Sequence, residues 1–145
     1  MKLNLSRIFF LSSLFVMLEI QASELIINLS DQKKAGTLRL AIYNNAEAFE
    51  GSVVKEKSSE IGVFKGLELY LEPQDSNQLS TEIPDGEYAI AFFIDANGNK
   101  KLDKNFLGIP KEQYGFSNNA MGTLSAPTFE QAKFKVAGNT VQNIK

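Results

Sequence analysis

Apolar and polar residues alternate along several short stretches of this chain, a pattern typical of half-buried β-strands. Over residues 37–43, Leu38, Leu40 and Ile42 fall on one face and Arg39 on the other. The same period of two recurs over residues 67–71. Shorter or less regular patterns predict further strands at residues 25–29, 52–55, 61–64, 88–94, 129–136 and 140–144, with 52–55 as an exposed edge strand.

Residues 88–94 are expected to form a central strand, because both of their faces are apolar. A Pro84-Asp85-Gly86 turn precedes this strand, and Tyr88 has the spacing of a tyrosine corner, in which the hydroxyl bonds to upstream backbone. No stretch has a convincing helical period. The sequence therefore predicts an all-β fold, an antiparallel β-sandwich of about seven strands with one long aromatic-containing loop.

The first 22 residues have the pattern of a signal peptide. Lys2 and Arg7 precede an apolar run over residues 8–18, and Ala22 is a small residue suited to the cleavage position. A run of eleven residues is too short to span a bilayer, which needs about 20 apolar residues. We therefore expect export to the periplasm or the medium, with residues 23–145 forming a single domain and no transmembrane segment in the mature chain.

Composition excludes several chemistries. The chain has no cysteine and no histidine, which removes disulfides, thiol chemistry, histidine-ligated zinc and histidine-dependent nucleophilic catalysis. Loss of Lys2, Arg7 and Glu19 with the signal changes the net charge from −2 to −3. A mildly acidic domain without a basic cluster in its sequence argues against nucleic acid and against anionic membrane surfaces as partners.

An oxygen-rich stretch follows the predicted central strand. Its side chains at relative positions 1, 3, 5 and 9 resemble the first half of an EF-hand calcium loop, and they are Asp95, Asn97, Asn99 and Asp103. Further oxygens would have to come from outside this stretch, with Glu112, Asn105 and Asp85 as candidates. This pattern predicts a calcium site of weak, extracellular type.

The same stretch has a second interpretation. The glycine expected at position 6 of a calcium loop is Lys100, and the acid expected at position 12 is Phe106. Asn97-Gly98 is a common tight turn, and Asp95 and Asn99 can accept bonds from nearby backbone amides. Both a metal site and a turn held by its own side chains remain open at this point.

Residues 102–128 show no strand periodicity, and a loop of that length in a compact domain is usually functional. Aromatic, amide and hydroxyl side chains gather near its middle, as they do in peptide and sugar sites. The candidate ligand-binding residues are Tyr114, Phe116, Ser117, Asn118 and Asn119. The alternative is an internally packed cap that closes one end of the core.

Two runs of residues resemble the bacterial family called domain of unknown function 2141. The first extends from Gly86-Glu87-Tyr88 through Asn97-Gly98-Asn99 to Asp103, and the second from Asn105-Phe106-Leu107-Gly108 to Asn119-Ala120. Pro127, Phe129 and the strand through Phe134 also fit. Members commonly have glycine where this chain has Lys100. The resemblance implies an exported β-sandwich of transthyretin-like or immunoglobulin-like type, and no established activity.

These observations favour an exported, non-enzymatic module that binds a protein, peptide or glycan through the end of the sandwich from Asp95 to Asn119, with calcium as an optional support. No catalytic residue is assigned. One alternative is a small hydrolase using paired carboxylates such as Asp95 or Asp103 with Glu112. Another is a structural envelope component that assembles through the predicted edge strand at residues 52–55.

Overall fold

The computed structural model describes residues 22–53, 62–123 and 125–145, and only the backbone of Gln74 and Asp75. The predicted signal peptide, apart from Ala22, therefore lies outside the described residues. No helix in these ranges is long and apolar enough to span a bilayer.

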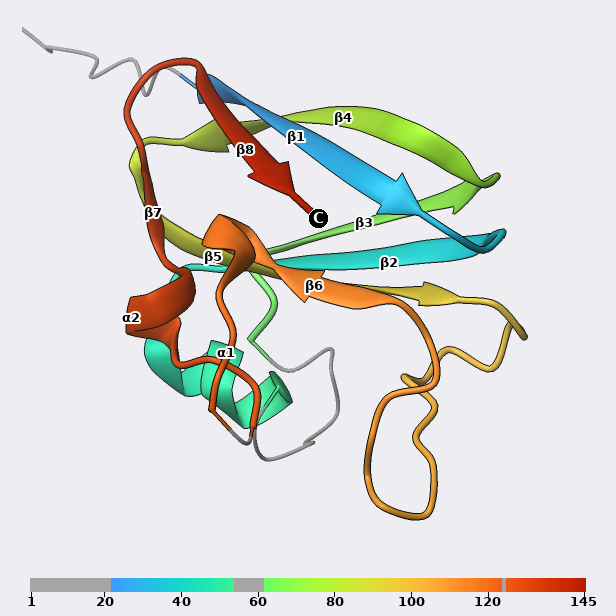
Figure 1. Ribbon diagram of the computed structural model, residues 1–145. Helices are drawn as coiled ribbons and strands as arrows, with labels where there is room; N and C mark the ends of the chain where they lie inside the picture. Colours follow the sequence, from blue (N-terminus) through green and yellow to red (C-terminus); the bar gives the residue numbers. More distant parts are fainter. Residues whose placement is uncertain (1–21, 54–61, 124) are drawn as a thin grey trace, which may run out of the picture.

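Two sheets pack face to face (Figure 1). Sheet I has the order β4-β1-β8, formed by Gln74–Pro84, Ala22–Gln32 and Thr140–Ile144. Sheet II has the order β3-β2-β5-β6, formed by Lys65–Leu71, Gly36–Tyr43, Gly86–Asp95 and Tyr114–Phe116. Strand β7, Phe134–Val136, pairs with the first residues of β5.

The inward positions of both sheets form the main core. Alternate residues of β1, β2 and β5 are almost completely buried, among them Leu25, Ile27, Leu38, Leu40, Ile90 and Ile94. The predicted all-β sandwich is thus confirmed, and so is the central place of the strand at residues 88–94. The described residues contain eight strands, however, and β1 pairs with β8 in parallel, so sheet I is mixed rather than purely antiparallel.

Strand β4 was not predicted. Its sequence is polar on both faces, and only Leu79 and Ile83 face the core. It is an edge strand that forms through a long antiparallel register with β1, from Ala22 opposite Pro84 to Gln32 opposite Gln74. Backbone pairing, which leaves no periodicity in side-chain polarity, produces this strand.

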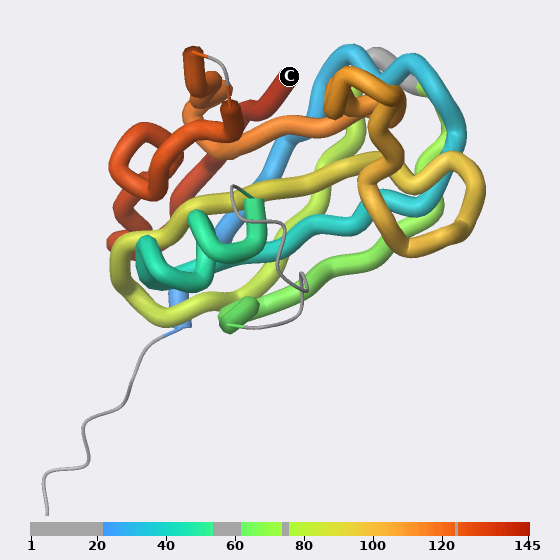
Figure 2. Tube along the Cα trace, turned by 90° about the horizontal axis from the view of Figure 1, so that it is seen from below, coloured from blue at the N-terminus to red at the C-terminus, as the bar shows by residue number. Residues whose placement is uncertain are grey.

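A second apolar cluster lies on the opposite face of sheet II, under helices α1 (Ala46–Val53) and α2 (Phe129–Ala132) (Figures 1 and 2). We call it the aromatic cluster. The ring of Phe49 is fully buried and makes edge contacts with three other rings, at centroid distances of 5.6 to 6.2 Å. These rings belong to Tyr43, Phe116 and Phe129.

Helix α1 corrects the prediction of an edge strand at residues 52–55. Asn45 begins the helix, because its side-chain oxygen accepts from the amide of Ala48 at 2.9 Å. Phe49 and Val53 then lie four residues apart on the side that packs against sheet II. Ser52 and Val53 are therefore helical, and residues 54 and 55 lie outside the described residues.

Two further strand boundaries differ from the prediction. Residues 129–132 form α2 instead of a strand, because Thr128 and Gln131 make a capping box, and only residues 134–136 are extended. Residues 62–64 form a turn and bend, while residue 61 lies outside the described residues. The tyrosine corner is confirmed, since the Tyr88 hydroxyl donates to the carbonyl of Pro84 at 2.9 Å.

Candidate binding site at the loop between β5 and β6

The loop over residues 96–113 connects two adjacent strands of sheet II and extends away from both sheets (Figure 1). The predicted excursion over residues 102–128 was too long, because β6 pairs with β5 at Phe93–Tyr114 and Ala91–Phe116. The amide of Ile94 also donates to the carbonyl of Gln113 at 2.8 Å. The loop is therefore closed at its neck by the sheet itself.

Asp95 fixes the base of this loop. Its side chain is fully buried at the last position of β5. Its Oδ1 accepts from the amides of Gly98 at 2.7 Å and Asn99 at 3.2 Å. Its Oδ2 accepts from the amide of Lys100 at 2.8 Å and from Nε of Arg39 at 3.0 Å. One carboxylate thereby folds the first turn of the loop back onto the end of the strand.

These contacts decide the charge state of Asp95. Burial alone would raise its pKa, because a buried carboxylate loses hydration. The hydrogen bonds from Arg39, Lys100 and Gly98, together with the charge of Arg39, outweigh burial and lower the pKa. The group is ionised at neutral pH and held in place. A general acid for glycoside hydrolysis needs the opposite shift.

Lys100 adopts a backbone conformation that usually requires glycine. Its φ is 64°, in the left-handed region. This is the position at which the calcium-loop pattern and the resembling family have glycine. The loop thus keeps the shape that the pattern implies, and the bond from the Lys100 amide to Asp95 offsets the strain of a side chain there.

The other predicted metal ligands also come together at the base. The Asp103 carboxylate accepts from the side-chain amides of Asn97 at 2.6 Å and Asn99 at 2.9 Å. The side-chain oxygens of both asparagines accept backbone amides. Glu112 clamps the two limbs of the loop, because it accepts from the amides of Ala96 and Asp103, both at 3.0 Å.

This geometry bears on the calcium hypothesis. Each predicted ligand already has oxygens that accept hydrogen bonds from the chain, so the base is held together without a cation. In the described part of the chain, no three acidic side chains gather in a way that could hold a metal ion. The turn held by its own side chains accounts for the contacts, and calcium binding stays a prediction.

The far end of the loop is apolar and exposed. Phe106 is 95% exposed, Leu107 67% and Ile109 55%. We call residues 106–109 the tip. Lys104 and Pro110 form a β-bridge at its neck, and the Asn105 amide donates to the carbonyl of Ile109 at 2.9 Å. The tip is a hydrogen-bonded turn.

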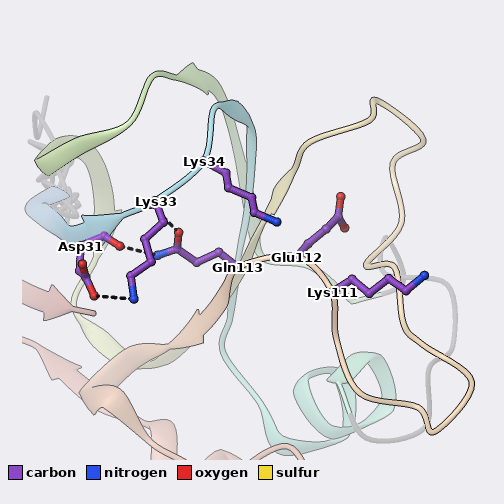
Figure 3. Close-up of a pocket in the computed structure, with 6 residues that line it drawn as sticks. All are labelled: Asp31, Lys33, Lys34, Lys111, Glu112 and Gln113. Atoms are coloured by element: carbon purple, nitrogen blue, oxygen red, sulfur yellow. Dashed lines mark hydrogen bonds and ion pairs between the residues drawn. The ribbon is translucent and has the colours of Figure 1, made fainter.

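Three lysines and two acids line a hollow beside the returning limb of the loop. The hollow has a volume of about 270 Å³ and lies between this limb and the turn that joins β1 to β2 (Figure 3). Lys33 and Lys34 come from the turn, and Lys111 from the limb. Gln113 joins the two elements, since its side chain accepts from the amide of Lys33 and donates to the carbonyl of Asp31.

The five predicted ligand residues have structural partners instead. Phe116 is buried in the aromatic cluster, and Tyr114 packs beside it. The Ser117 hydroxyl is fully buried, where it donates to the carbonyl of Ala132 at 2.6 Å and accepts from the amide of Ile90 at 2.8 Å.

Asn118 and Asn119 join separate elements in the short helix η1 (Ser117–Asn119). The Asn118 side chain donates to the carbonyls of Ala132 and Lys133, and Asn119 bonds with the backbone of Asn143 and Lys145. The predicted ligand set therefore ties sheet II to α2 and β8. A hollow of about 390 Å³ faces solvent here, and Tyr114, Phe116 and Asn119 are among the residues that line it.

The sequence analysis did not single out the exposed residues of the tip. Phe106, Leu107 and Ile109 were visible as apolar residues in a loop, but nothing in their spacing indicated that they stay exposed. The available signal was their position between Asn105, a turn-forming residue, and Pro110, with Lys104 and Lys111 on the outer sides.

Comparison with known proteins places the chain in a family. The model of a family described as "Uncharacterized protein conserved in bacteria (DUF2141)" matches residues 27–145. No curated protein and no solved structure matches the chain. The matched range contains most of β1, all other described strands, the loop between β5 and β6, and the aromatic cluster. The chain belongs to this bacterial family, whose resemblance was already evident in the residues from Gly86 to Val136.

Proposed function

We propose that this chain is an exported, non-enzymatic contact module that works through the loop between β5 and β6. The observation that supports this proposal is the tip, where three large apolar side chains are exposed on a turn with a defined backbone. Exposed apolar side chains gathered at one place favour a contact role, because leaving them in water has a free-energy cost.

The proposed contact surface is the tip, and it differs from the five candidate ligand residues at positions 114 and 116–119. A protein, peptide or glycan was expected to bind at residues 114–119, but most of those side chains are tied to neighbouring elements. The tip side chains are 55 to 95% exposed, so no element of the described chain covers them, and the tip lies beyond the polar base of the loop. We therefore assign the contact to residues 106–109 and the supporting role to Asp95, Asp103 and Glu112.

The hydrolase alternative is less well supported. Asp95, Asp103 and Glu112 each accept hydrogen bonds from amides of the loop, so their oxygens serve its folding. The pKa of Asp95 is lowered, whereas a catalytic acid needs a raised pKa. The envelope-assembly alternative relied on an edge strand at residues 52–55, and the described half of that stretch is helical.

The experiment is an envelope-binding assay. The purified chain beginning at Ser23 is mixed with washed envelope from the native bacterium after deletion of its gene for this chain. The fraction of the protein that pellets with the envelope is then measured. The tip variant carries Phe106→Ser, Leu107→Ser and Ile109→Ser. A matched control carries three serines at other exposed apolar positions, Tyr70, Met121 and Val141, which are 50 to 64% exposed.

We expect the wild type and the matched control to pellet equally and the tip variant to remain in solution. Equal pelleting of all three proteins, or pelleting of none, would contradict the proposal.

Export itself is tested separately. Cell fractionation followed by N-terminal sequencing should recover a chain that starts near Ser23 outside the cytoplasm.

A further inference from the structure

The tip is a projection, not a groove. It lies at the end of a loop that extends from the sandwich, beyond the polar base formed around Asp95 (Figure 1). Phe106, the first residue of the tip, is 95% exposed, so its side chain has few neighbours in the described part of the chain. A projecting apolar turn suits a deformable partner into which it can insert, such as the interfacial layer of a bilayer.

Backbone amides of the tip are hydrogen-bonded within the turn, which suits them to an apolar environment. The side-chain oxygen of Asn105 accepts from the amides of Leu107 at 2.9 Å and Ile109 at 3.0 Å. The amide of Gly108 donates to the carbonyl of Asn105 at 2.9 Å, and the positive φ of Gly108, 78°, allows the turn to close. Three successive amides are thereby satisfied within the turn. Moving them out of water costs little, whereas unpaired amides would oppose insertion.

The charges around the tip have one predominant sign. Residues 96–113 contain two acids and four lysines and so carry a net charge of +2, although the whole chain carries −2. The lysines are Lys100, Lys101, Lys104 and Lys111, and we call them the basic collar. Lys34 adds a further ammonium group across the hollow from Lys111 (Figure 3).

The two acids in this range limit its net charge to +2, and Glu112 lines the same hollow as Lys111. Asp103 and Glu112 accept amides at the base of the loop, as described above. The expectation that the chain avoids anionic membranes came from its overall charge and from the lack of an evident basic cluster in its sequence. Within the loop, however, lysine outnumbers acid, and Lys104 and Lys111 flank the tip on either side along the chain.

We propose that the tip inserts among the headgroups of an anionic lipid bilayer, with Phe106, Leu107 and Ile109 in the interfacial layer and the basic collar on the lipid phosphates. This inference rests on the proposed contact function of the same loop and names its partner. The charge complementarity between lysines and phosphates selects an anionic surface over a neutral one. A protein partner would instead need a cavity of its own shaped for the tip.

The first test is co-sedimentation with vesicles. The chain beginning at Ser23 is mixed with large vesicles of phosphatidylcholine alone, or of phosphatidylcholine with one quarter phosphatidylglycerol. We expect partitioning onto the anionic vesicles, a loss on the order of 100-fold in the tip variant, and no loss in the matched control. Lys104→Gln with Lys111→Gln should weaken the partitioning by roughly 10-fold, and added salt should weaken it as well.

A spectroscopic test reports on insertion directly. The chain has no tryptophan, so Phe106→Trp introduces a single indole ring into the tip. Its emission should move to shorter wavelength when anionic vesicles are added, because the ring leaves water. Met121→Trp, at a position 64% exposed on another part of the surface, should show no such change.

Three outcomes would overturn the inference: no partitioning onto anionic vesicles, equal partitioning of the tip variant, or equal partitioning onto neutral vesicles. The envelope assay separates these failures from failure of the proposed function. If envelope binding needs the tip but vesicle binding is absent, the module contacts a protein or glycan and only the lipid inference fails. If neither assay depends on the tip, both proposals fail.

Discussion

The aromatic cluster and the tip are two apolar groups on the same side of sheet II, and they differ in burial (Figure 1). The cluster is covered by α1 and α2, so that Phe49 is fully buried. Among residues 22–53, 62–123 and 125–145, no element covers the tip, and Phe106 is almost fully exposed. The first group supplies stability to the domain, and the second costs solubility without adding stability. This difference is the physical reason to assign function to the tip.

The largest expected effect is a loss of stability when Phe49 is replaced. Replacing Phe49 with alanine should lower the free energy of unfolding by about 3 to 5 kcal/mol, because it removes a buried ring and its three aromatic contacts. Urea unfolding at equilibrium measures the change. The matched substitution is Phe106→Ala, for which we expect a change within about 0.5 kcal/mol. Similar losses at the two positions would remove the distinction.

The next effect is at the base of the loop. Asp95→Asn should lower the free energy of unfolding by about 3 kcal/mol, because an amide nitrogen would face the Arg39 guanidinium and the Lys100 amide. Glu68→Gln is the control. Glu68 pairs with the other side of Arg39 at 2.5 Å but is 64% exposed, so its loss should cost about 0.5 kcal/mol or less. A larger loss at Glu68 would contradict the central role of Asp95.

Acid should weaken the base of the loop selectively. Because the folded-state pKa of Asp95 is lowered, its ionised form contributes stability above the unfolded-state pKa of about 3.9. That contribution is lost as the pH falls through the folded-state value. The stability difference between wild type and Asp95→Asn should therefore shrink below about pH 4. Unfolding curves between pH 2 and 6 measure it, and a difference that stays constant would show that Asp95 does not titrate as described.

How far the sequence predicts this molecule depends on whether side-chain polarity or backbone pairing forms each element. The strands with one apolar face, such as β2 and β3, were evident because burial imposes a period of two on their residues. Strand β4 was not evident, because its pairing with β1 involves backbone groups. Helix α1 was mistaken in part for a strand, since Phe49 and Val53 are too few to define a helical period.

The same contrast applies to the site. Asp95 and Asp103 were singled out as metal ligands from their spacing and Glu112 as a further candidate, and in the structure each accepts backbone or side-chain amides at the base of the loop. That Asp95 accepts nearby backbone amides was one of the two interpretations of the sequence, but its contact with Arg39 is tertiary, and no local pattern contains it. The exposure of Phe106 likewise depends on which elements fail to cover it, and the sequence of the loop does not specify that.

Serines at the tip should hardly change stability. The three substituted side chains are already 55 to 95% exposed, and the amides of the turn are held by Asn105. We expect the tip variant to unfold within about 0.5 kcal/mol of the wild type. Thermal unfolding checks this result. A marked loss of stability would mean that the tip packs against the domain, and it would also weaken the binding assays as evidence for contact.

Calcium should have the smallest effect of all. Any ion that binds only the folded chain must raise the unfolding midpoint by linkage. Because the oxygens at the base already accept hydrogen bonds, we expect the same midpoint in EDTA and in millimolar calcium. Asp103→Ala is the control variant. A rise with calcium that disappears in Asp103→Ala would restore the metal site and assign a cation to the base of the loop.

The parallel pairing of β1 with β8 has a consequence for how this domain is made. Residues 25–29 form the centre of sheet I only when residues 140–144 are present beside them. Contacts across such a sequence separation form late, because the loop between them must first close. A chain that emerges from its N-terminus therefore cannot complete sheet I until its last strand has emerged. If the chain is exported, as we propose, and crosses the membrane unfolded, sheet I can be completed only after β8 has crossed.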